Sequence, residues 1–140
     1  MKQMAVVYWT GTGNTEAMAQ AVADGAREAG AEVRVLTSDA FEPAMADQCS
    51  AIAFGCPAMG DEVLEQDEFE PMFTQCLPRL AGKSIALFGS YGWGSGQWMG
   101  DWEETCRKSG AVLAAGSVIC QEYPDEEALS ACRALGAALS

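Results

Sequence analysis

The sequence predicts a doubly wound α/β fold, a three-layer sandwich in which helices cover both faces of a five-stranded parallel sheet of order 2-1-3-4-5. Apolar, β-rich runs alternate along the chain with segments of helical periodicity, which is typical of parallel strands joined by right-handed crossovers. The runs at 51–55 and 84–90 are continuously apolar, as expected for central strands buried on both faces. The loops richest in glycine and polar residues follow the first, third and fourth strands, which this order makes neighbours.

The N-terminal part supplies two strands and a helix. Residues 3–9 (QMAVVYW) form an almost entirely apolar run. Residues 14–29 follow it with one helical face that holds Met18, Val22, Gly25 and Ala29. Gly30 is suited to end that helix. The next run, 31–36, alternates apolar and charged residues, which predicts a less buried edge strand.

The rest of the chain continues the alternation. Between the two central strands, residues 69–80 have helical spacing, with Pro71 tolerable only in the first turn. After residue 96 a further helix turns two tryptophans inward, and residues 111–119 are predicted to form the fifth strand. A last helix opens at Pro124. No repeat or linker interrupts this pattern, so residues 1–140 are expected to form one domain.

Charge and composition exclude several classes of partner. Lys and Arg total 8 against 20 Asp and Glu, and His is absent, which gives a formal net charge of −12. Such a surface repels the phosphates of nucleic acid and of anionic membranes, whereas it attracts a basic protein partner. The six cysteines lie far apart without a CxxC pair and are expected to be reduced and mostly buried. With no signal peptide and no apolar run of spanning length, a cytoplasmic protein is expected.

The first loop, TGTGNT, is predicted to bind a phosphate group. It lacks the lysine of a Walker A loop, and Glu16 stands where a dinucleotide-binding fingerprint has its third glycine, so neither nucleotide site fits. Backbone N–H groups at a helix N-terminus, assisted by hydroxyl and amide side chains, can still hold a phosphate dianion. An ordinary strand-to-helix turn is the alternative. The residues assigned to the phosphate are Thr10, Gly11, Thr12, Gly13, Asn14 and Thr15.

The other two loops suit a flat, redox-active ring. Trp93 lies between Gly92 and Gly94 in a loop of small residues, where no periodicity predicts its burial. An exposed indole in that position is expected to stack on a ligand. Met59, in the loop after the third strand, offers a polarisable apolar wall for the opposite face of the ring, although a core position also fits this residue.

Taken together, TGTGNT after the first strand, CPAMGDE after the third and GSYGWGSG after the fourth resemble the flavodoxin family over essentially the whole chain. The fifth strand continues to its helix without a long insertion, so the chain resembles the short-chain branch typical of anaerobic bacteria. The resemblance implies one non-covalent FMN and low-potential, one-electron exchange with redox partner proteins, with the flavin cycling mainly between neutral semiquinone and hydroquinone. Thr10 stands where the family commonly has serine and keeps the hydroxyl.

The resemblance also assigns roles to single residues. Residues 10–15 would hold the FMN phosphate, and the isoalloxazine would lie between Met59 and Trp93. Glu62 would accept a hydrogen bond from flavin N3–H, and the Gly60 carbonyl would accept one from N5–H of the neutral semiquinone after a peptide flip that glycine permits. The remaining members of the implied cofactor site are Ala58, Asp61, Ser90, Tyr91, Gly92 and Gly94.

Acidic residues are expected to crowd the rim of this site. Their charges disfavour an anionic hydroquinone, which lowers the second reduction potential, and they attract partners with basic docking surfaces. For any one of these residues, an ordinary solvated surface position is the alternative. The residues are Asp61, Glu62, Glu65, Asp67, Glu68 and Glu70.

Two other functions compete with electron transfer. A small FMN-dependent reductase needs a substrate pocket, commonly with a general acid or base, yet the chain has no histidine and no second domain or long lid. A phosphoacceptor receiver domain needs acids after the first and third strands, where this chain has YWT and GCP. The sequence therefore favours a monomeric electron carrier without a substrate of its own, with the reductase as the alternative.

Overall fold

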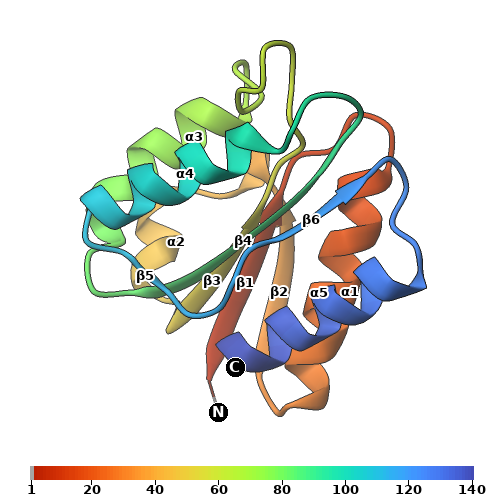
Figure 1. Cartoon of the computed structure of the whole chain (residues 1–140). Coiled ribbons are helices and arrows are strands. Elements are labelled where there is room, and N and C mark those ends of the chain that lie inside the picture. Colours follow the sequence, from red (N-terminus) through yellow and green to blue (C-terminus); the bar gives the residue numbers. More distant parts are fainter. Residues whose placement is uncertain (1) are drawn as a thin grey trace.

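The computed structural model describes residues 2–140 and contains one parallel sheet (Figure 1). The strand order is β2-β1-β3-β4-β5, with β6 also paired to β4, and every pairing is parallel. This confirms the predicted order 2-1-3-4-5 and places β2 at an edge. The strands are β1 (Gln3–Tyr8), β2 (Glu32–Thr37), β3 (Ala51–Gly55), β4 (Ser84–Tyr91), β5 (Val112–Leu113) and β6 (Val118–Gln121).

Helices cover both faces of the sheet, as Figure 1 shows. One face carries α1 (Asn14–Glu28) and α5 (Glu126–Leu139), and the other carries α2 (Pro43–Asp47), α3 (Phe69–Cys76) and α4 (Gln97–Lys108). Because successive side chains of a strand point to opposite faces, Met4 and Val6 enter the core under α1 and α5, whereas Ala5 and Val7 enter the other core. The sequence analysis did not predict α2, which begins with a proline in its first turn.

The fifth strand differs from its prediction. Instead of one strand over 111–119, the structure has β5 and β6, which pair with successive parts of β4. Between β5 and β6, the four residues 114–117 lie beside only two residues of β4, 86 and 87. The segment from β5 to β6 therefore carries two more residues than the part of β4 beside it. Such a bulge interrupts the ladder at a sheet edge, where it also hinders pairing with another chain.

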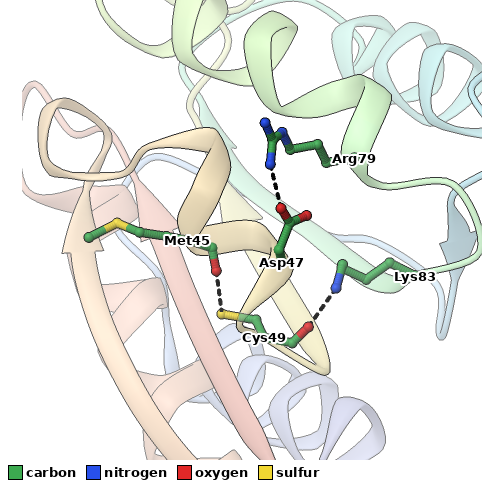
Figure 2. A network of polar contacts seen from close by, with 5 residues as sticks. All are labelled: Met45, Asp47, Cys49, Arg79 and Lys83. Atoms are coloured by element: carbon green, nitrogen blue, oxygen red, sulfur yellow. Dashed lines mark hydrogen bonds and ion pairs between the residues drawn. The ribbon is translucent and has the colours of Figure 1, made fainter.

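A polar network far from the loops connects α2 to the neighbouring segments (Figure 2). The Arg79 guanidinium pairs with Asp47 at the end of α2, and the Lys83 ammonium donates to the Cys49 carbonyl. The Cys49 thiol in turn donates to the Met45 carbonyl. These contacts hold the start of β4 and the end of α2 together.

The predicted core residues of α4 are buried, and the thiols have the predicted character. Trp98, Met99 and Trp102 all lie in the core under α4. All six cysteines are unpaired, four of them are buried, and burial raises the pKa of Cys56 to about 12. Over residues 2–140, no helix has the length and apolarity needed to cross a membrane.

Candidate functional site

The three predicted loops meet at the carboxyl ends of β1, β3 and β4 (Figure 1). They enclose a hollow of ≈ 250 Å³ at the point where the strand order reverses, between β1 and β3. We call it the loop hollow. The predicted site residues that line it are Gly11, Thr12, Asn14, Ala58, Met59, Ser90, Tyr91 and Gly92.

One side of the loop hollow is the N-terminus of α1. Gly13 precedes the helix in a left-handed conformation (φ 95°), and the first backbone bond of the helix runs from Ala17 N–H to the Gly13 carbonyl at 3.1 Å. The N–H groups of residues 14–16 therefore make no hydrogen bond to any described residue. Unpaired donors at the positive end of a helix dipole fit an anion such as a phosphate.

Two of the residues predicted to bind a phosphate, Thr10 and Thr15, have hydroxyls that form hydrogen bonds with other residues of the protein. The Thr10 hydroxyl accepts a hydrogen bond from Gly13 N–H at 3.0 Å, which fixes the bend of the loop. Thr15 is only 1% exposed, and its hydroxyl lies 3.2 Å from the Ser90 hydroxyl at the end of β4. The structure thus turns the Thr15 side chain under the loop, where it joins the first loop to the third.

The loop after β3 forms a closed turn. Met59 N–H donates to the Val63 carbonyl at 2.8 Å, and Val63 N–H donates to the Met59 carbonyl at 3.0 Å. Gly60 and Glu62 both adopt left-handed conformations, with φ 50° and 58°. We call residues 59–63 the Gly60 turn. No atom lies within 4 Å of a Cβ built on Gly60, so backbone conformation rather than space restricts substitution there.

Glu62 has a structural contact that the sequence did not reveal. Its Oε1 accepts hydrogen bonds from Gly96 N–H and Gln97 N–H, both at 2.9 Å, and so completes the N-terminus of α4. Its Oε2 has no hydrogen-bond donor within residues 2–140 and stays available as an acceptor. The carboxylate connects the Gly60 turn to the loop that carries Trp93.

Trp93 is exposed, as predicted. Its side chain is 66% exposed, whereas Met59 is partly buried. The Gln121 side chain donates to the Gly92 carbonyl at 3.1 Å, which anchors the tryptophan loop to β6. The exposed indole is available for stacking.

Five of the six residues expected on the acidic rim are at least partly exposed, and the expected exposure is wrong for Glu65. None of the six is in the lining of the loop hollow. Asp61, Asp67, Glu68 and Glu70 are exposed and Glu62 is partly exposed, but Glu65 is 6% exposed. Glu65 accepts hydrogen bonds from the N–H groups of residues 67, 68 and 69 at 2.7 to 2.9 Å. Burial alone would raise its pKa, but these three donors outweigh it and hold the pKa below the ordinary 4.5. Glu65 therefore holds the chain at the start of α3 rather than forming part of the exposed rim.

Sequence analysis missed three residues that line the loop hollow: Trp9, Pro57 and Glu122. Trp9 and Pro57 lie next to predicted segments, so an extension by one or two residues would have found them. Glu122 follows β6 in a left-handed conformation (φ 61°), and its N–H donates to the Tyr91 carbonyl at 2.8 Å. Only the pairing of β6 with β4 brings it to the site, and no local signal in the sequence indicates that.

Comparison with known proteins agrees with this geometry. Residues 6–136 match the sequence family described as Flavodoxin. The chain is 46% identical over 124 residues to the flavodoxin of Clostridium beijerinckii, which covers 88% of this chain and 89% of that protein. It is 46% identical over 136 residues to the flavodoxin of Megasphaera elsdenii, which covers 95% of each.

A solved structure of this family is also similar. The solution structure of two-electron reduced Megasphaera elsdenii flavodoxin has a TM-score of 0.90 and 43% sequence identity to this chain, over 97% of both chains. The sheet order, the three loops at its reversal point and the sequence similarity lead to the same assignment. This chain belongs to the flavodoxin family, as a short-chain member.

Proposed function

We propose that this protein is a low-potential one-electron carrier that exchanges electrons with redox partner proteins through a non-covalently bound FMN. The observation that carries the proposal is the loop hollow, in which unpaired N–H groups of α1 and the three loops converge beside an exposed tryptophan. Membership of the flavodoxin family, whose proteins carry electrons on FMN, supports it.

The residues around the loop hollow fit FMN in charge and shape. The free N–H groups of residues 14–16, with the Thr12 and Asn14 side chains, would bind the phosphate dianion without any lysine or arginine. Met59 and Trp93 would cover the two faces of the ring, and the Glu62 Oε2 would accept from its N3–H. The bound flavin supplies the electron-transfer chemistry; the protein binds it, orients it and surrounds it with negative charge.

The partners and location follow from charge and thiol chemistry. Exposed carboxylates around the site, within a net charge of −12, fit partners with basic docking surfaces and would repel nucleic acid and anionic membranes. Six unpaired thiols fit the reducing cytoplasm. We place the protein there as a single-domain monomer without a substrate of its own.

Stepwise anaerobic reduction of the FMN-loaded protein tests the proposal through its visible spectrum. A one-electron carrier will pass through a blue one-electron-reduced species before it bleaches. Direct passage from yellow to colourless will favour a two-electron FMN-dependent reductase instead. If purified protein binds no FMN, the proposal is wrong.

Replacing Gly60 with threonine is expected to reduce the accumulation of the one-electron-reduced flavin. The proposed peptide flip needs both peptide orientations to be open at Gly60, which already lies in the left-handed region. If a β-branched residue adds about 1 to 2 kcal/mol to the flipped orientation, the equilibrium constant for forming that species should fall about five- to thirtyfold. The spectrum at half-reduction measures this. Gly60→Asn is the control, because asparagine tolerates the left-handed region and should retain more of the species. Equal accumulation in Gly60→Thr and the parent protein would refute a role for this turn.

A further inference from the structure

A second hollow lies on the other side of the Gly60 turn, between α3 and α4. It measures ≈ 210 Å³, and we call it the α3–α4 groove. Figure 1 shows the two helices side by side on one face of the sheet. The groove shares Glu62 and Val63 with the Gly60 turn but no residue with the lining of the loop hollow. Its lining is Glu62, Val63, Leu64, Glu70, Phe73, Thr74, Leu77, Trp98, Asp101, Trp102 and Thr105.

The groove combines an apolar floor with an acidic rim. Phe73, Trp98 and Trp102 close the floor but are only 2 to 3% exposed, so Val63, Leu64 and Leu77 supply most of its accessible apolar surface. The charged residues of its lining are all acidic: Glu62, Glu70 and Asp101. Glu70 and Asp101 are exposed, and across the described chain neither takes part in an ion pair.

We propose that the α3–α4 groove receives an arginine side chain from the redox partner. Three carboxylates without a cation select a positive group, and an apolar floor beside them suits the apolar stem and weakly hydrated guanidinium of arginine better than the strongly hydrated ammonium of lysine. The volume equals that of roughly seven waters, which is room for one long side chain and not for a helix. The inference rests on the proposed exchange of electrons with partner proteins and adds where such a partner is anchored.

The position of Glu62 explains why an anchor here matters for electron transfer. Glu62 belongs to the Gly60 turn, its Oε1 completes the N-terminus of α4, and the same residue lines the groove. An arginine bound in the groove therefore lies against the turn that borders the loop hollow. If bound arginine changes the conformational equilibrium of the Gly60 turn, the conformation of the turn changes the affinity for arginine by the same factor.

Trp102 provides a built-in reporter for the occupant. The residue is 3% exposed, and its indole nitrogen has no hydrogen-bond partner among residues 2–140, whereas the Trp98 indole donates to the Cys56 carbonyl at 3.3 Å. The chain has four tryptophans, and Trp9 and Trp93 lie outside the groove lining. Their four indole N–H signals in a ¹⁵N–¹H spectrum therefore separate groove binding from binding elsewhere.

The test is a titration of the FMN-loaded, oxidised protein with N-acetyl-arginine amide, followed by those four signals. We expect the Trp98 and Trp102 signals to shift together with a dissociation constant of about 1 mM, while Trp93 stays in place. The citrulline analogue has the same shape without the charge and should bind at least tenfold more weakly. Asp101→Asn should weaken arginine binding about two- to fivefold, and Glu104→Gln, on the exposed surface of the same helix and outside the groove lining, should not.

The inference is overturned by equal binding of arginine and citrulline amides, by shifts at Trp93 alone, or by equal effects of Asp101→Asn and Glu104→Gln. Shifts that depend on protein concentration without added probe would also overturn it, because a second copy of the chain would then be the occupant. Repeating the titration on the FMN-free protein separates this result from the proposed function. Loss of FMN binding with groove binding intact would refute only the proposed function.

Discussion

Replacing Gly136 with alanine will lower the free energy of unfolding by about 2 to 4 kcal/mol, because α5 and α1 pack with their backbones in contact. A Cβ on Gly136 would lie 2.0 Å from the Val22 carbonyl oxygen, and a Cβ on Gly25 would lie 1.9 Å from the Arg133 carbonyl oxygen. Non-bonded atoms attract at about 3.5 to 4.0 Å, so the helices must separate by about 1 Å or more. Backbone atoms cannot rotate away as a side chain can, and the whole contact loosens.

Urea unfolding of the FMN-free proteins measures this effect without a contribution from ligand binding. Gly100→Ala is the matched control, since Gly100 is an exposed residue of α4 whose Cβ would meet nothing closer than 3.9 Å. The control should gain about 0.5 to 1 kcal/mol from the higher helix propensity of alanine. Similar stability of Gly136→Ala and the parent protein would show that α1 and α5 can separate at little cost.

The sheet could be predicted because its signals are local. The continuous apolar runs of β3 and β4 and the alternation in β2 identify central and edge strands without knowledge of any partner. The division of the fifth strand could not be predicted, because residues 111–119 are uniformly apolar or small and the interruption exists only in their pairing with β4. The five-residue α2 is too short to show periodicity. Gly25 was predictable as part of a buried face but not as a point of backbone contact.

In the candidate site too, features with a local sequence signal could be predicted, and features that depend on tertiary contacts could not. The three loops and the exposure of Trp93 could be predicted because glycine, hydroxyl and aromatic residues in a loop have a direct physical meaning. The hydroxyl of Thr15 and the carboxylates of Glu62 and Glu65 find donors in other segments or around a turn, so their residue type alone gave no orientation. The sequence alone predicts that all residues of an acidic run are exposed to solvent. Only the structure shows that backbone N–H groups surround the carboxylate of Glu65.

Replacing Glu65 with glutamine should lower the free energy of unfolding at pH 7 by about 2 to 4 kcal/mol, because the backbone donors around its carboxylate lose an acceptor. The Glu65 Oε1 accepts from the N–H groups of residues 68 and 69, and Oε2 accepts from residue 67. Glutamine replaces one of these oxygens with an NH₂ group, so at least one backbone donor then faces another donor. Because the same residue lies between the Gly60 turn and α3, the loss should also loosen the segment beside the loop hollow.

The pH dependence of the difference identifies its cause. The folded pKa of Glu65 lies below the ordinary 4.5, so its stabilisation is fully present above pH 4.5 and disappears as pH falls through the folded pKa. The stability gap between the parent protein and Glu65→Gln should therefore be constant from pH 7 down to about pH 5 and narrow below the ordinary pKa. Glu68→Gln is the control, because it removes an equal charge from an exposed neighbour whose carboxylate makes no hydrogen bond to the described chain. The free energy of unfolding of this variant should stay close to that of the parent protein at every pH. A gap for Glu65→Gln that persists unchanged at acid pH would mean that side-chain packing, rather than a buried carboxylate held by three amides, stabilises this turn.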